Sequence, residues 1–158
     1  MDTIRVVWGS GTGPTAMASY DAALADAGVH NYNLVSVSSM IPAGAEVDAV
    51  GAAPDLGAVG GRLTVVEARA SASEPGHVSA GLAWVQSSEG GLFYEAAGET
   101  DAADVEERVR RGVEAGQELR SAWTFDEPRV RVQSTRVEPG THTTAVVLAV
   151  YGDADALV

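Results

Sequence analysis

The sequence predicts a single α+β domain whose sheets are mostly antiparallel. The chain has 158 residues, a usual length for one domain and enough to bury most of its apolar surface. The hydrophobic periodicity predicts more strands than helices, and most of these strands follow one another directly along the chain. This order favours an α+β fold over a doubly wound parallel sheet, in which strands and helices alternate.

The first third of the chain predicts a strand, a helix and a second strand. A short strand over Ile4–Trp8 leads into a glycine-rich turn, Gly9–Thr15. Helix formers then fill Ala16–Ala27, and Gly28 is typical of the residue that ends a helix. β-Branched residues predict the next strand over Asn33–Val37.

The middle of the chain predicts a loop and then three strands in a meander. Residues 43–61 are rich in Gly, Ala and Pro and show little periodicity, which indicates a loop. Strands are expected over Arg62–Ala70, Val78–Gln86 and Gly91–Ala96. The doublet Ser87-Ser88, followed by Glu and two glycines, is typical of a hairpin turn between the last two of these strands.

The last third predicts a helix and two strands. The helix starts at residues 99–101, and Glu106 and Arg110 have the i,i+4 spacing of a helical ion pair. Its apolar stripe consists of Val105, Val109, Val113 and Leu119. Arg129–Val137 alternates as a strand, and Thr143–Tyr151 is so apolar that it is expected to be central in its sheet.

The composition excludes disulfides and argues against a metal site and a membrane segment. The chain has no cysteine, so disulfides and thiolate metal ligands are excluded. The histidines His30, His77 and His142 are scattered, and no metal site is expected. No apolar run approaches the ~20 residues of a membrane span, and the N-terminus has no apolar signal core. A cytoplasmic protein with no membrane partner is therefore expected.

The charge is strongly acidic. The formal net charge is −12, and all basic residues are arginine. Such a surface argues against nucleic-acid or anionic-membrane partners and attracts a cationic substrate. It also fits a salt-filled cytoplasm, because the Debye length falls to ~3 Å in 1 M salt and the repulsion between the acidic side chains is then screened. We therefore hypothesise a halophilic protein, the alternative being a mildly acidic mesophilic one.

A second serine doublet, Ser38-Ser39, ends the strand predicted over residues 33–37, and Pro42 and Gly44 follow it closely. A strand that stops beside a constrained turn suits a strained peptide bond. There, a serine hydroxyl can attack the carbonyl carbon before it and convert the peptide to an ester. Elimination then leaves a pyruvoyl group, whose ketone binds an amine and accepts its electrons as pyridoxal phosphate does.

Four further features are candidates for the site, each with an ordinary alternative. The Gly9–Thr15 stretch resembles a phosphate cradle but lacks the lysine and spacing of known ones, so a tight turn explains it as well. Asp21 in the first helix either pairs with a cationic substrate or faces solvent. Glu95 is either a buried general acid or an outward-facing strand residue. Asn33 has no strong local meaning.

The chain resembles the pyruvoyl-dependent arginine decarboxylases of archaea and some bacteria. The resemblance rests on Gly9–Thr15, on Tyr20-Asp-Ala-Ala-Leu24, on Ala27-Gly-Val29 and above all on Asn33-Leu-Val-Ser-Val-Ser-Ser-Met-Ile-Pro42. It implies a four-layer αββα sandwich that assembles as a homotrimer or a hexamer with sites between subunits. It also implies conversion of L-arginine to agmatine and CO2, a step of polyamine biosynthesis.

The resemblance assigns roles to the candidate residues. The proenzyme would cleave itself between Ser38 and Ser39 into a small chain, 1–38, and a large chain, 39–158. Ser39 would become the covalent pyruvoyl cofactor, and Ser38 would line the pocket as the new C-terminus. Glu95 matches the proton donor, Asn33 a residue near the pyruvoyl group, and Asp21 the carboxylate that binds the guanidinium of the substrate.

Two departures from the family pattern bear on the substrate. Position 30 is a histidine where a smaller pocket residue is expected, and the 43–61 loop is unusually rich in Gly and Ala. The alternatives are a decarboxylase of another amino acid such as histidine, an uncleaved homologue that serves as an assembly or regulatory subunit, and a module that binds phosphate ligands through Gly9–Thr15.

Overall fold

Long strands of small and β-branched residues form two sheets that pack face to face. The computed structural model describes residues 3–158. Sheet A is five-stranded, in the order β2 (Asn33–Ser36), β5 (Arg62–Ala72), β9 (His142–Asp155), β1 (Thr3–Gly13) and β4 (Glu46–Gly51). Sheet B is four-stranded, in the order β3 (Met40–Ile41), β7 (Gly90–Gly98), β6 (His77–Ser87) and β8 (Arg129–Arg136).

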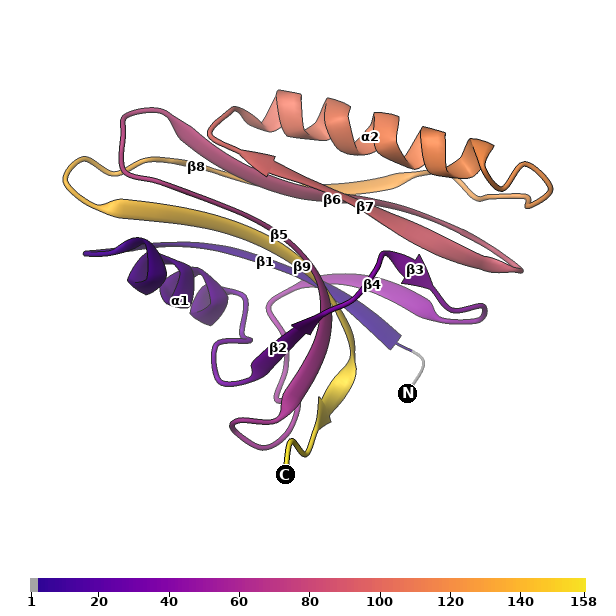
Figure 1. Ribbon diagram of the computed structural model, residues 1–158, viewed down its shortest axis with the longest axis horizontal. Coiled ribbons are helices and arrows are strands. Elements are labelled where there is room, and N and C mark those ends of the chain that lie inside the picture. The colour runs from indigo at the N-terminus through magenta and orange to yellow at the C-terminus, as the bar shows by residue number, and fades with distance from the viewer. Residues whose placement is uncertain (1–2) are drawn as a thin grey trace.

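One helix covers the outer face of each sheet, which gives the four layers αββα (Figure 1). Sheet B is antiparallel throughout, whereas sheet A contains the parallel pairs β1–β4 and β2–β5 at its two edges. The expected fold class, an α+β sandwich with mostly antiparallel sheets, is therefore confirmed. Neither helix of residues 3–158 is long and apolar enough to cross a membrane.

Helix α1 (Ala16–Asp26) packs very closely on β1, and glycines make this possible. The side chain of Thr15 caps the helix by accepting a hydrogen bond from the Ala18 N–H at 3.0 Å. A Cβ atom on Gly11 would lie 2.5 Å from the backbone nitrogen of Ala23. The Gly9–Thr15 stretch was expected to be a turn. It is instead mostly strand, and its glycines leave room for the helix backbone.

Helix α2 (Ala102–Glu118) follows the predicted pattern. The Asp101 side chain caps it through the Asp104 N–H at 2.9 Å. Its valines at 105, 109 and 113 are fully buried against sheet B. The predicted ion pair between Glu106 and Arg110 is present at 3.0 Å on the exposed face. Leu119, expected in the apolar stripe, is 83% exposed because the helix ends at Glu118.

The main core lies between the two sheets, where apolar side chains from both inner faces meet. Its aromatic members are Trp84 and Phe93, whose ring centroids are 5.9 Å apart. The strand β9 lies between β5 and β1 in sheet A, which confirms its expected central place. Burial on both faces explains why its middle, residues 145–150, is wholly apolar.

Two expectations about the middle of the chain are wrong. Residues 43–61 are not all loop, because they contain β4, which pairs in parallel with β1. The strand β5 does not continue into a meander with β6 and β7. It belongs to sheet A between β2 and β9, and only β6 and β7 form the expected hairpin.

Candidate functional site

The Ser38–Ser39 bond lies where the chain crosses from one sheet to the other. Before the bond, β2 pairs with β5 in sheet A, and the Val37 N–H donates to the Val65 carbonyl at 3.0 Å. After it, the Ser39 carbonyl accepts from the Phe93 N–H at 2.8 Å, and β3 pairs with β7 in sheet B. Figure 1 shows this passage of the purple chain from β2 to β3. The two serines are thus attached to different layers, and we refer to residues 37–39 as the crossover.

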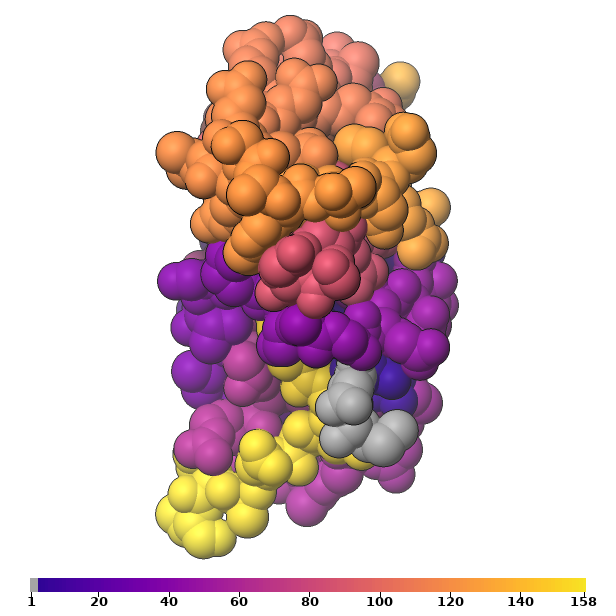
Figure 2. Space-filling model, turned by 90° about the vertical axis from the view of Figure 1, so that its right-hand side faces the viewer, coloured from indigo at the N-terminus to yellow at the C-terminus, as the bar shows by residue number. Residues whose placement is uncertain are grey.

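The chain after the crossover is fixed more firmly than the crossover itself. The Tyr151 hydroxyl donates to the Met40 carbonyl at 2.8 Å, and burial raises the pKa of Tyr151 to about 12, so it stays a donor. Figure 2 views this end of the molecule, where the purple segment after β3 lies against the pink β6–β7 hairpin. The Gln86 side chain donates to the Ala45 carbonyl there at 2.8 Å. Ser38 is exposed, and Ser39 is half-buried.

Asp21 and Asn33 line one pocket between α1 and the start of β2. The pocket has a volume of about 560 Å³. Asp21 is exposed, and the Asn33 amide nitrogen donates to the Gly60 carbonyl at 2.8 Å. His30 and Leu24 also line this pocket. The structure therefore brings two predicted site residues together and places the unusual histidine beside them.

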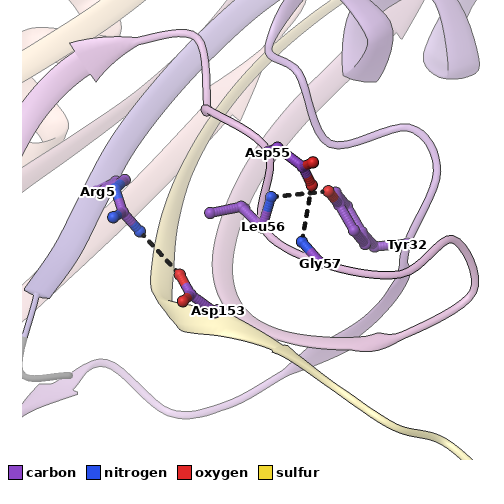
Figure 3. A network of polar contacts seen from close by, with 6 residues as sticks. All are labelled: Arg5, Tyr32, Asp55, Leu56, Gly57 and Asp153. Carbon is purple, nitrogen blue, oxygen red and sulfur yellow. Dashed lines mark hydrogen bonds and ion pairs between the residues drawn. The ribbon is translucent and has the colours of Figure 1, made fainter.

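Backbone groups at the end of the 43–61 segment hold side chains that line this pocket. The Tyr32 hydroxyl, another part of the lining, accepts a hydrogen bond from the Leu56 N–H at 3.0 Å, as Figure 3 shows. The Asp55 carboxylate accepts from the Gly57 N–H at 3.0 Å and shapes the same bend. Nearby, Arg5 and Asp153 join β1 to β9 at 3.4 Å. The segment thus positions Tyr32 and Asn33 through its backbone.

Glu95 lies on β7, in a different pocket from Asp21 within the chain. This pocket has a volume of about 330 Å³, and Arg108 and Arg111 of α2 share it. Burial raises the pKa of the Glu95 carboxyl, and the charge of Glu67 raises it further. This direction is the one a carboxylic acid needs in order to donate a proton near neutral pH. Glu95 is nevertheless exposed within the single chain, so the expectation of a buried residue is not met there.

A polar group that the sequence did not reveal joins α1 to β5 beside the pocket of Asp21. The Tyr20 hydroxyl donates to the Glu67 carboxylate at 2.6 Å, and the Arg69 guanidinium carbon lies 4.2 Å from the Tyr20 ring centroid. Tyr20 also lines the pocket of Asp21. Glu67 and Arg69 share a face of β5 with the apolar Leu63 and Val65, but nothing local in the sequence indicates that Tyr20 is their partner.

Within residues 3–158, no group of three or more His, Asp or Glu side chains is placed to hold a metal ion. The arrangement offers serine hydroxyls at a chain crossover, a carboxyl with a raised pKa on one sheet and a carboxylate pocket under α1. These groups suit cleavage of the backbone at serine and the binding of a cationic molecule.

Comparisons with known proteins agree along nearly the whole chain. The family model described as pyruvoyl-dependent arginine decarboxylase matches residues 3–156. A protein of that name from Halobacterium salinarum is 56% identical over 156 residues, which cover 98% of this chain and 97% of the relative. A relative with the same name from Pyrococcus abyssi is 35% identical, over 88% of this chain and 89% of the relative. Another, from Methanocaldococcus jannaschii, is 30% identical, over 87% of this chain and 80% of the relative.

Proposed function

The chain belongs to the pyruvoyl-dependent arginine decarboxylase family, and we propose that it converts L-arginine to agmatine and CO2 with a pyruvoyl group made from its own Ser39. Family membership makes the chain a carboxy-lyase that depends on a covalent pyruvoyl group. The observation that carries the proposal is the position of the Ser38–Ser39 bond at the crossover between two sheets.

Self-cleavage at this bond divides the chain into residues 1–38 and 39–158. The Ser39 hydroxyl attacks the Ser38 carbonyl carbon, and the peptide nitrogen leaves it to give an ester. Elimination breaks the ester, releases the Ser38 carboxylate and leaves a double bond in residue 39. Addition of water and loss of ammonia then complete the ketone. Both ends stay attached, because each is hydrogen-bonded to a different sheet.

The surroundings of Ser39 fit the group. Its carbonyl is held by the Phe93 N–H and the next carbonyl by the Tyr151 hydroxyl, both at 2.8 Å, so the residue is fixed from its C-terminal side. When present, the group would supply a ketone that can bind the substrate amine and accept the electron pair released with CO2. Ser39 is half-buried, which limits the access of water to that position.

The other residues bind the substrate and move the proton. Asp21 pairs with the guanidinium and so fixes the distance of the reacting carbon from Ser39. Asn33 and Ser38 line the space between them. Glu95 returns a proton to the α-carbon, a role that its raised pKa supports.

We place this chemistry in a homotrimer or hexamer with sites between subunits. Two observations support an assembly of that kind. The pockets of Asp21 and Glu95 are separate within one chain, so a second copy is needed to join them into one site. The rim around the crossover also exposes apolar side chains that a second copy would cover: Met17 at 71%, Val35 and Val37 at 42% and Met40 at 41%.

The acidic, lysine-free composition and the relative from Halobacterium support a halophilic source and a location in the salt-filled cytoplasm.

One mass measurement and one assay test the proposal. An intact-protein mass spectrum is expected to show two fragments that divide between residues 38 and 39, the larger without a free amino terminus. Release of labelled CO2 from arginine is then compared with release from a panel of amino acids that includes histidine. A single full-length mass with no CO2 release would point instead to an uncleaved, non-catalytic homologue.

A further inference from the structure

We propose that His30 is a substrate-binding residue of the pocket that holds Asp21. Its neutral imidazole accepts a hydrogen bond from the guanidinium of arginine, and its protonated form repels that guanidinium. This inference rests on the proposed function, in which the pocket binds the guanidinium. It gives a role to a histidine that stands where the family pattern predicts a smaller residue.

The turn that carries His30 is held on both sides. Before it, Val29 is fully buried, and its N–H donates to the Leu24 carbonyl at 2.9 Å. After it, the Asn31 carbonyl accepts from the Gly60 N–H at 2.8 Å. These backbone bonds fix position 30 between α1 and β2, although the histidine itself is exposed within the single chain.

The pocket offers hydrogen-bond acceptors to a cation. Asp21 contributes a carboxylate to the lining. The Asn33 amide nitrogen already donates to the Gly60 carbonyl at 2.8 Å, which leaves the amide oxygen as an acceptor. A neutral imidazole adds one accepting ring nitrogen, whereas a guanidinium has five N–H donors and no acceptor. The polar lining therefore suits a guanidinium while His30 is neutral.

Histidine is the side-chain type in this lining whose charge ordinarily changes between pH 5 and 8. The other titratable side chains of the lining are Asp21 and Tyr20 of α1 and Tyr32 of the turn that carries His30. The Tyr20 hydroxyl donates to the Glu67 carboxylate at 2.6 Å, and burial raises the pKa of Tyr20 to about 12. Side-chain carboxylates and phenols ordinarily titrate outside the range of histidine.

The charged groups around the lining leave His30 and Asp21 open to a ligand. Arg62 begins β5 beside β2, and the Arg69 guanidinium carbon lies 4.2 Å from the centroid of a tyrosine ring on α1. The Asp55 carboxylate accepts a backbone N–H at 3.0 Å. Within residues 3–158, no ion pair within 4.0 Å joins His30 to a carboxylate, so a guanidinium can bind to His30 and Asp21 without breaking one.

The consequence is a competition between the substrate and the proton on His30. Protonation removes the accepting nitrogen and adds a like charge, so arginine binds more weakly as the pH falls through the titration of His30. By linkage, bound arginine makes His30 harder to protonate. The effect belongs to binding and is therefore expected in KM, whereas kcat depends on Glu95 and on residue 39.

The first measurement is an NMR titration of the three histidine rings in the uncleaved Ser39→Ala protein. L-Arginine, added until the spectrum no longer changes, is expected to move the midpoint of His30 to lower pH. His77 and His142 do not line this pocket and should keep their midpoints. An unmoved midpoint of His30, or an equal shift of His77, overturns the inference.

The second measurement is the KM for arginine between about pH 5.5 and pH 8. In the unaltered enzyme KM should rise roughly three- to tenfold toward the lower pH, the size expected for like charges near a protein surface. His30→Gln keeps an acceptor without the charge and should hold KM nearly constant, whereas His77→Gln should behave as the unaltered enzyme. An unchanged pH dependence in His30→Gln contradicts the inference.

The two measurements also separate this inference from the proposed function. The NMR titration needs no decarboxylation. A chain that releases no CO2 but shows the shift of His30 would refute the proposed function and leave the binding role of His30 standing.

Discussion

The two serine doublets of this chain differ in what they connect. Ser87-Ser88 joins β6 to β7 within sheet B, whereas Ser38-Ser39 joins β2 in sheet A to β3 in sheet B. In the hairpin, the Ser87 hydroxyl donates to the Gly90 carbonyl at 2.7 Å and accepts from the Glu89 N–H at 3.2 Å. At the crossover, neither serine hydroxyl forms a hydrogen bond to any part of the chain that the structure describes.

This difference shows how the same dipeptide serves two purposes. A hydroxyl used to close a turn is directed at a backbone group ahead of it and is not free to attack the carbonyl behind it. A hydroxyl with no partner, on a chain that is held from both sides, is free to do so. The neighbouring strands, rather than the dipeptide, are therefore the reason why we expect only one doublet to be reactive.

The largest expected effect comes from removing one hydroxyl of each doublet. Ser39→Ala should abolish both cleavage and decarboxylation, because it removes the nucleophile and the source of the ketone. Ser88→Ala should cleave as the unaltered chain does. Intact mass and CO2 release measure both outcomes. Cleavage of the Ser39→Ala protein, or loss of cleavage in Ser88→Ala, would break the distinction between the doublets.

The next largest effect is expected on β7, the strand that follows one doublet and pairs with β3 after the other. A variant there should lose catalysis but keep cleavage. Glu95→Gln should still cleave but decarboxylate about 10²- to 10⁴-fold more slowly, the usual loss for a missing general acid. Glu89→Gln, in the hairpin itself, is the matched control and should cleave and decarboxylate as the unaltered chain does. The two are compared by fragment mass and by kcat. Normal turnover in Glu95→Gln would remove this residue from the proton-donor role.

A smaller effect is expected for the carboxylate on the small-chain side of the crossover. Asp21→Asn should raise the KM for arginine about ten- to a hundredfold and change kcat less, because a charged hydrogen bond is worth about 1.5–3 kcal/mol. Asp48→Asn, on the exposed edge strand β4, serves as the control for charge. Steady-state kinetics on arginine measure the change. An unaltered KM would place the guanidinium elsewhere.

The smallest expected effect is that of salt, which acts on the whole surface and does not distinguish the two doublets. With a net charge of −12, the melting temperature should rise by several degrees between dilute buffer and molar KCl, as the Debye length falls from ~10 Å at 0.1 M to ~3 Å at 1 M. Calorimetry across salt concentrations measures this rise. Equal melting temperatures would count against a halophilic protein.

The helices and the long strands could be predicted because their periodicity is local. The short edge strand β4 could not, since only Val47 of its residues is buried and it is held by pairing with β1. The glycines of β1 were misread as a turn, because the reason for them is the backbone of α1 rather than their own conformation. Membership of β5 in sheet A is likewise fixed by partners far along the chain.

The candidate site also divides into residues that local motifs indicate and contacts that depend on distant parts of the chain. The roles of five residues were predicted from a resemblance carried by short motifs, and these roles stay predictions. The residues are Asp21, Asn33, Ser38, Ser39 and Glu95. The structure places Asp21 and Asn33 in one pocket and Glu95 in another. The contact between Tyr20 and Glu67 joins residues 47 positions apart, and no local pattern indicates such a pair.

The place of β1 in sheet A would have a consequence for the cleaved protein proposed above. This strand lies between β9 and β4, so residues before Ser39 form an interior strand of a sheet made mostly by residues after it. Before cleavage, folding is a reaction of one molecule. After the proposed cleavage, an unfolded enzyme would regain its sheet only when two separate peptides meet, so its recovery would depend on protein concentration. The uncleaved chain would then be the form that folds easily, and the cleaved form would keep a structure that it does not readily rebuild.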